Sequence, residues 1–321
     1  MTFHWQWLFV SLIGFSVAVA SEPLSDQPSS ISISPDTSAY LTNPGSATQS
    51  QRFQQGYFTD IANKRALVCY VTTLSDCLQM LPTHLRQQTV FSRAAIRNAI
   101  GYKSAMVLSA HDKAIAGVIV LNPNKDIAEQ SGSIGLTTYQ LPLKQQAQLT
   151  LWHELGHLYN IDLQQTLLPG SLSEYQHEWL ADIYLLWRIA HHYPQLDLAW
   201  QQFHRRNLAL INDSANLSHW SAPQLQIALT HYSIEQLQKF VRYEDFIAAV
   251  YPLMPLWSER DMAEFSSLIQ RTFGAGVVQP LPGYMFWRQP KLVEVLSPTL
   301  EQLMGKGNAQ LWLQQQFSTV N

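Results

Sequence analysis

The sequence is poor in charged residues, cysteines and long apolar runs. Charged side chains make up 13% of its 321 residues, against about 25% in an average soluble protein. The net charge of −3 provides no basic field for nucleic acid or for an acidic membrane surface. After the N-terminus, no segment is apolar over the roughly 20 residues that cross a bilayer. We therefore expect no nucleic-acid partner and no membrane span in the mature chain.

Cysteine occurs only at Cys69 and Cys77, eight residues apart. This spacing is not that of a zinc knuckle. In an oxidising compartment a close pair of this kind most often forms a disulfide, which we predict here. Two buried free thiols are the alternative.

The first 20 residues resemble a secretory signal peptide, because an apolar run ends in the small-residue sequence Ala-Val-Ala. An uncleaved N-terminal anchor is the alternative, since this segment lacks Lys and Arg. Residues 21–51 are about half Ser, Thr and Pro and contain no Lys or Arg, which predicts a disordered tether. We expect a folded domain over residues 52–321 and a periplasmic or secreted location.

The sequence patterns of residues 52–321 predict an α+β protein, in which a small β-containing lobe precedes a mainly helical lobe. β-rich runs occur near residues 66–73, 104–110, 114–122 and 131–139, and a helical pattern covers 85–100. From Pro142 onward, amphipathic patterns predict helices over 143–160, 172–192, 195–211, 222–230, 234–250, 258–273 and 298–317.

The motif HELGH lies just past the junction of these lobes, in a segment whose pattern predicts one continuous helix. His153 and His157 are four residues apart and therefore share one helix face, where both imidazoles can bind a single ion. Glu154 lies about 100° around the helix, where it can flank a water molecule in an open coordination position. Gly156 lowers helix propensity, and the close approach of a neighbouring segment would explain it.

A catalytic zinc ion usually has three protein ligands, and the next predicted helix can supply the third. Ser171 to Glu174 read as a capping box that starts this helix. Glu178 and Asp182 follow, four residues apart and facing the same way. Glu178 is the candidate third ligand, and Asp182 can accept a hydrogen bond from a ligand histidine.

HELGH followed by EWLAD, which begins 21 residues beyond the last histidine of HELGH, resembles the gluzincin class of zinc metallopeptidases. The resemblance covers about thirty residues, and implies a zincin-like fold with its active site at the junction of the lobes. It implies one zinc ion per chain on His153, His157 and Glu178, with Glu154 as general base and Asp182 orienting a ligand histidine. In this class an edge strand before the helix aligns the peptide, and the strands expected between residues 105 and 138 suit that role.

The residue that stabilises the oxyanion is not fixed by spacing. His219 and His231 are candidates, followed by Tyr159 and Tyr232. His177, beside Glu178, is expected to point elsewhere, to the surface. The metzincin class is excluded, because its glycine and third histidine are replaced by asparagine and leucine at positions 160 and 163.

These residues predict an exported zinc metallopeptidase that hydrolyses peptide bonds in a peptide or protein substrate. Zinc would activate water and the scissile carbonyl, Glu154 would transfer the proton, and His219 would stabilise the oxyanion. Two alternatives stay open: a non-enzymatic zinc-containing envelope protein for binding or assembly, and a zinc hydrolase acting on a non-peptide amide. The sequence does not indicate the oligomeric state.

Overall fold

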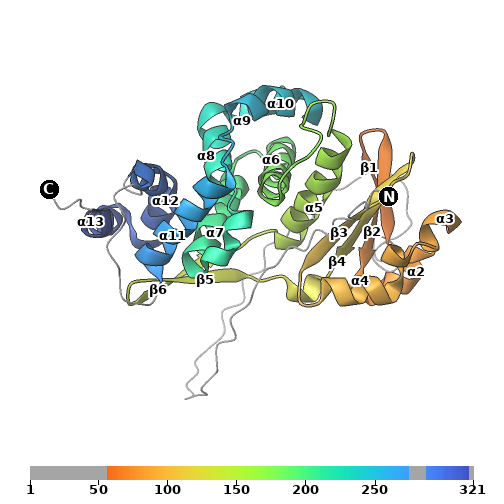
Figure 1. The fold of residues 1–321 in the computed structure, drawn as a ribbon, viewed down its shortest axis with the longest axis horizontal. Helices are drawn as coiled ribbons and strands as arrows, with labels where there is room; N and C mark the ends of the chain where they lie inside the picture. The colour runs from red at the N-terminus through yellow and green to blue at the C-terminus, as the bar shows by residue number, and fades with distance from the viewer. Residues whose placement is uncertain (1–55, 275–286, 318–321) are drawn as a thin grey trace, which may run out of the picture.

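The computed structural model describes residues 56–274 and 287–317. The expected signal peptide and tether lie outside these residues. The chain forms an α+β structure in which a small N-terminal sheet precedes a mainly helical region, as the sequence predicts (Figure 1). None of the described helices has both the length and the apolar character that crossing a bilayer requires.

The N-terminal lobe is built on a four-stranded sheet in the order β1-β2-β4-β3. Its strands are β1 (Tyr57–Ile61), β2 (Lys64–Tyr70), β3 (Ala105–Ser109) and β4 (Ile115–Leu121). β2 and β4 are parallel, and the two outer pairs are antiparallel. Among the described residues, β3 pairs with β4 alone, so it forms an edge of the sheet.

Helices cover both faces of this sheet. One face carries α2 (Leu74–Leu78), α3 (Thr83–Arg86) and α4 (Arg93–Ile100), and the other carries α5 (Gln146–Asp162) (Figure 1). β4 is therefore buried along its whole length, as its continuous apolar sequence predicts. α5 comes so close that a Cβ atom on Gly117 would lie 2.8 Å from Leu158 Cδ2.

Residues 131–139 form most of a hairpin, where the sequence predicts a single strand. The hairpin consists of β5 (Glu129–Ile134) and β6 (Thr137–Pro142). The turn includes Gly135 with a φ of +62°, a conformation that glycine adopts without steric cost. The hairpin leads the chain from the sheet to the helical lobe, where β5 packs against α7.

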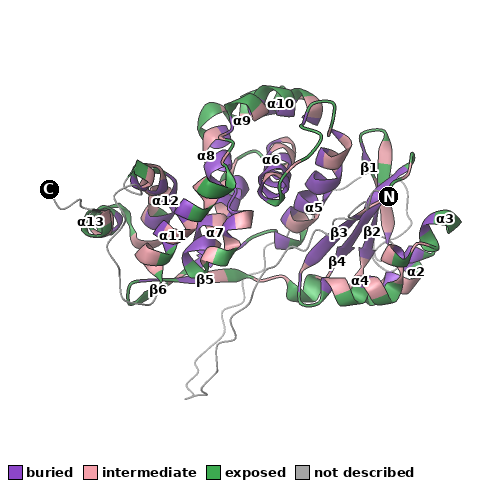
Figure 2. Ribbon diagram, viewed as in Figure 1, coloured by how far each residue is buried: buried purple, intermediate pink, exposed green. Residues whose placement is uncertain are grey.

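The helical lobe surrounds α5 and α6, which are buried along most of their length (Figure 2). After α5, its described elements follow in chain order: α6 (Glu174–His192), α7 (Asp197–Asn212), the 3-10 helix η4 (Ser214–His219), α8 (Ala222–His231), α9 (Ile234–Gln238), α10 (Tyr243–Val250), the 3-10 helix η5 (Tyr251–Leu253), α11 (Glu259–Phe273), α12 (Gln289–Met304) and α13 (Lys306–Phe317).

Local backbone signals move several boundaries from their predicted positions. α5 starts at Gln146, because Pro142 ends β6 and Gln145 adopts a left-handed conformation. Ser92 caps α4 and thereby divides the segment predicted as one helix over 85–100. Gly305, with a φ of +80°, separates α12 from α13. The segment 234–250 likewise forms two helices, α9 and α10, and the capping box of α6 is formed by Ser173 and Gln176.

Gly156 lies at a close contact between α5 and α6. A Cβ atom at this position would lie 2.9 Å from both the Cα and the carbonyl oxygen of Ala181, and 3.0 Å from Tyr184 Cβ. Backbone atoms cannot move aside as a flexible side chain can. Two small residues, Gly156 and Ala181, therefore let the two helices pack at a distance that a larger pair would not permit.

Cys69 and Cys77 form the predicted disulfide, which joins β2 to α2. Both cysteines are fully buried between the sheet and its covering helices. Gly56 lies against the bridge with a φ of +89°, and a Cβ atom there would be 2.2 Å from Cys77 Sγ. The disulfide thus fixes α2 on the sheet and leaves space only for glycine beside it.

We expect Gly156→Ala to lower the free energy of unfolding. An added methyl group in a tightly packed contact lowers stability by about 1–3 kcal/mol. The higher helix propensity of alanine opposes this by about 1 kcal/mol. Gly307→Ala in α13 is the matched control, because a Cβ atom there meets nothing within 4 Å. Urea denaturation should show the control unchanged or stabilised. Equal stabilisation of both variants would contradict the close helix contact.

We expect the Cys69→Ala/Cys77→Ala double variant to lose about 2–3 kcal/mol of stability, the magnitude for closing a loop of this length. Mass spectrometry of the native protein without reductant should show one peptide pair linked through both cysteines. Alkylation of two thiols in the native, unreduced protein would contradict the disulfide.

Candidate metal centre

α5 and α6 each present two functional side chains at a spacing of four residues. His153 and His157 stand on α5, and Glu178 and Asp182 stand on the facing side of α6. All four side chains are buried, with at most 7% of the surface of any of these residues exposed. The close contact at Gly156 brings the two pairs together.

His153, His157 and Glu178 form a group whose ligand atoms all lie within 4.8 Å of one another. Nε2 of His153 is 3.3 Å from one carboxylate oxygen of Glu178, and Nε2 of His157 is 3.6 Å from the other. Ligands about 2.0–2.1 Å from a tetrahedral ion are about 3.3 Å apart. The donor spacing therefore suits a shared metal ion.

Two of these donor atoms make little contact with other polar groups. Apart from their own 3.3 Å contact, Nε2 of His153 and Oε2 of Glu178 are buried and have no hydrogen-bond partner among the described residues. Buried polar atoms without hydrogen bonds are unfavourable unless an ion or a water molecule contacts them. Two imidazoles and a carboxylate form a donor set that binds zinc and other first-row divalent metals.

Asp182 is the centre of the hydrogen-bond network behind these ligands. One of its oxygens lies 2.8 Å from Nδ1 of His153 and accepts from the Gln202 amide at 3.0 Å. The other accepts from Nε of Arg206 at 2.7 Å and from the Ser221 hydroxyl. A proton on Nδ1 of His153 leaves the Nε2 lone pair directed at the cation position.

Burial and charge together set the protonation of the ligands. Burial lowers the pKa of His157 to about 3, so this imidazole is neutral and able to bind a metal at physiological pH. Burial also disfavours charged His153, but the Asp182 and Glu178 carboxylates outweigh it and raise the pKa to about 9. The same carboxylates favour a metal cation in place of that proton. Burial alone would raise the pKa of Glu178, but the facing histidines hold it well below its usual range.

Glu154 lies beside the cluster and is not part of it. Burial, supported by the charge of Glu178, raises the pKa of Glu154 to about 7. A carboxylate with a pKa near neutrality can both take up and release a proton at physiological pH. The geometry therefore places Glu154 beside, but outside, the group of three side chains that could hold a metal.

Of the four candidates for the oxyanion role, only His219 lies at the cluster. Its Nε2 atom is 3.7 Å from Glu178 Oε1, and η4 and Ser221 hold this segment against α6. His231 is exposed at the end of α8, and Tyr159 donates a hydrogen bond to Glu244 at 3.1 Å. Tyr232 packs among the aromatic rings of Phe240 and Phe246.

No protein-family model, curated protein or solved structure matches this chain.

The structure corrects one prediction and adds residues that the sequence did not reveal. His177 is buried rather than on the surface, with 5% exposure, and it lies on α6 among the residues that line a groove between the lobes. Arg206 pairs with Asp182 at 2.7 Å. Lys103 also lies near Glu154, and no spacing relates it or Arg206 to the motif.

We expect Asp182→Asn to weaken metal affinity about 10–100-fold, the range seen when the partner of a ligand histidine is changed. The asparagine side chain replaces one carboxylate oxygen of Asp182, which accepts hydrogen bonds, with an NH2 group, which donates them. This NH2 group would face other donors. Competition with a chromophoric chelator measures the affinity for zinc. Asp60→Asn, at an exposed position of β1, is the control and should bind as the unmodified protein does. Unchanged affinity in Asp182→Asn would contradict the role given to this network.

Proposed function

We propose that the protein is an exported zinc-dependent metallopeptidase of the gluzincin type. The observation that carries this proposal is the buried group of His153, His157 and Glu178 with Glu154 beside it. The residue order and the separation of the two motifs add to it, because they resemble those of gluzincins. Zinc is the proposed metal, since two imidazoles and one carboxylate are the ligand set of many catalytic zinc sites.

The described residues support a catalytic rather than a structural metal. A structural zinc site is normally closed by four protein ligands. Within the described ranges, the group able to hold a metal consists of three residues. The fourth position of a tetrahedral ion would therefore be open to water or substrate.

A zinc ion bound there would supply Lewis acidity to the scissile carbonyl and to the attacking water. Glu154 takes a proton from that water as its oxygen bonds to the carbonyl carbon. Glu154 then returns the proton to the leaving nitrogen as the C–N bond breaks, which yields a carboxylic acid and an amine. His219 is the side chain placed to stabilise the developing negative charge on oxygen.

The edge strand β3 supports a peptide as the substrate. It lies beside α5, and an extended peptide can add to the unpaired edge of a sheet through main-chain hydrogen bonds. A sheet edge above the metal-binding helix is the arrangement of a zincin-like fold, which we propose for this chain. The disulfide supports export, because such bonds persist mainly in oxidising compartments.

We expect Glu154→Gln to retain zinc and to lose peptide hydrolysis by about 10²–10⁴-fold, because the substitution removes only the general base. His153→Ala, His157→Ala and Glu178→Ala should lose the metal. Zinc per chain is measured by elemental analysis, and hydrolysis by a library of quenched fluorescent peptides. Removal of zinc by a chelator and its return should switch hydrolysis off and on.

Glu259→Gln is the matched control, since Glu259 is exposed at the start of α11 and lies outside the site. It should keep both zinc and activity. If Glu154→Gln hydrolysed peptides at the unmodified rate, the peptidase proposal would fail and the metal would have a structural role. Hydrolysis of non-peptide amides alone by the zinc-loaded protein would instead support the alternative hydrolase.

A further inference from the structure

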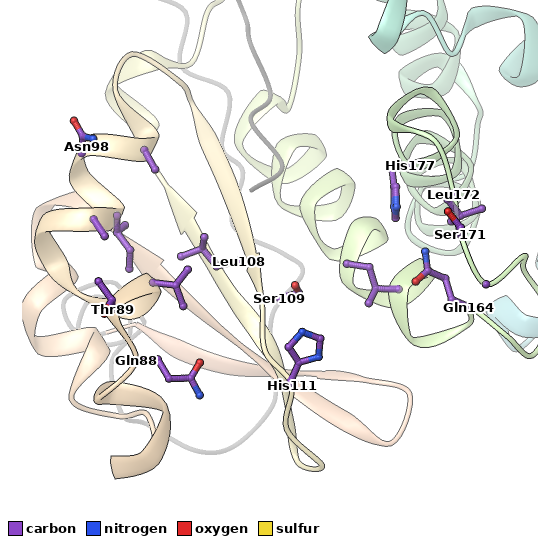
Figure 3. Close-up of a pocket in the computed structure, with 16 residues that line it drawn as sticks. Gln88, Thr89, Asn98, Leu108, Ser109, His111, Gln164, Ser171, Leu172 and His177 are labelled. Atoms are coloured by element: carbon purple, nitrogen blue, oxygen red, sulfur yellow. The ribbon is translucent and has the colours of Figure 1, made fainter. Parts of the chain in front are cut away.

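Two hollows lie toward opposite ends of β3 and α5. A groove of about 650 Å³ is lined by the last residues of both elements, including Ser109 and Ile161, together with residues between 88 and 99 and between 164 and 177 (Figure 3). A hollow of about 30 Å³ is lined by their first turns, including Ala105 and Thr150, together with the site residues His153 and Glu154. Along α5, His157 stands between the residues that line the narrow hollow and those that line the wide groove.

The two hollows differ in charge as well as in size. The residues that line the wide groove include no Asp, Glu, Lys or Arg. The narrow hollow contains three basic side chains, Lys103, Arg205 and Arg206. Arg206 is already paired with Asp182 at 2.7 Å. Lys103 and Arg205 are the other two cations; the Glu154 carboxylate lines the same hollow, and Asp126 is close enough to Arg205 to favour its charged form.

Lys103 is a buried cation whose ammonium group could bind an anionic ligand. It is 7% exposed, and its Nζ atom has no hydrogen-bond partner among the described residues. A buried ammonium without a partner is unfavourable, and an anion that accepts its hydrogen bonds removes that penalty. Burial lowers its pKa, an effect that the nearby Glu154 carboxylate opposes.

The direction of β3 indicates which end of a bound peptide would lie at the narrow hollow. β3 runs from Ala105 beside the narrow hollow to Ser109 beside the wide groove. A peptide that adds antiparallel to β3, the more stable pairing, runs the opposite way. Its N-terminal part then occupies the wide groove, and its C-terminal end meets Lys103 and Arg205.

We propose that Lys103 and Arg205 bind the free C-terminal carboxylate of a peptide, so that the protein removes short pieces from peptide C-termini. This inference rests on the proposed peptidase function. A volume of about 30 Å³ accommodates a group the size of a water molecule or a carboxylate rather than a continuing chain. The neutral wide groove has no carboxylate for an N-terminal ammonium, which disfavours removal of residues from the N-terminus.

The test compares two N-labelled alanine-rich peptides that differ only in a free C-terminal carboxylate or a C-terminal amide. Zinc-loaded unmodified protein should cleave the acid with a kcat/KM about 10–100-fold above that of the amide, the effect of a hydrogen bond to a charged group. Mass spectrometry should show loss of one or two C-terminal residues. In Lys103→Met, which keeps the apolar stem, this preference should disappear.

Lys113→Met is the matched control, since Lys113 is exposed in the loop before β4 and should keep the preference. Fluorescence anisotropy with zinc-loaded Glu154→Gln supplies a binding readout, in which the acid should bind about 10–100-fold more tightly than the amide. Because Lys103→Met removes a buried charge without a partner, the variant should fold, and thermal denaturation checks this.

The outcomes separate this inference from the proposed function. Equal cleavage and equal binding of acid and amide would overturn the carboxylate site and leave the peptidase intact. An equal loss of kcat/KM for both peptides in Lys103→Met would also overturn it, and would show that Lys103 acts through Glu154. Preferential binding of the acid without cleavage of either peptide would support the carboxylate site and contradict the peptidase function.

Discussion

The contact between α5 and α6 at Gly156 is the constraint on which the candidate site depends. A single Cβ atom at this position would meet the Ala181 backbone at 2.9 Å. Without that close approach, Glu178 could not lie 3.3 and 3.6 Å from the two histidines across the helix interface. Glycine lowers the intrinsic stability of a helix. At Gly156 it permits the contact that brings together His153, His157 and Glu178 from two rigid helices.

Burial of this group requires the rest of the helical lobe. Asp182 is fully buried, and an isolated carboxylate would be strongly unfavourable there. α7 supplies Gln202 and Arg206, and Ser221 follows η4, so donors from two further segments satisfy its oxygens. Because Arg206 also lies 3.8 Å from Glu178, the network joins three helices through charge rather than apolar contact alone. A helical lobe without α7 would leave Asp182 without its Gln202 and Arg206 donors.

The sequence predicts those parts of the site that depend on helical periodicity. His153, His157, Glu178 and Asp182 follow a spacing of four residues, and the structure brings all four together. Periodicity does not indicate which distant residues approach them, so Arg206 and Lys103 were not foreseen, and His177 was placed on the surface. The two lobes were predictable from their strand and helix patterns. The start of α5 was not, because Pro142 completes a strand pairing and Gln145 adopts a left-handed conformation, both of which depend on tertiary structure.

The position of each side chain around α5 explains how one helix can serve both lobes and still leave its motif open to a ligand. Successive residues are about 100° apart, so Leu158 lies on the side opposite Gly156. Gly156 faces α6, and Leu158 faces the sheet at Gly117. On the flank between these contacts, His153 is nearer the α6 side, His157 is midway, and Glu154 is nearer the sheet side. His153 and His157 lie 3.3 and 3.6 Å from Glu178, and Glu154 is turned toward the sheet lobe that carries β3. A peptide added to β3, as the proposed function requires, would meet Glu154 and the candidate metal ligands from the same flank. The spacing between the lobes would then be part of the geometry of the site.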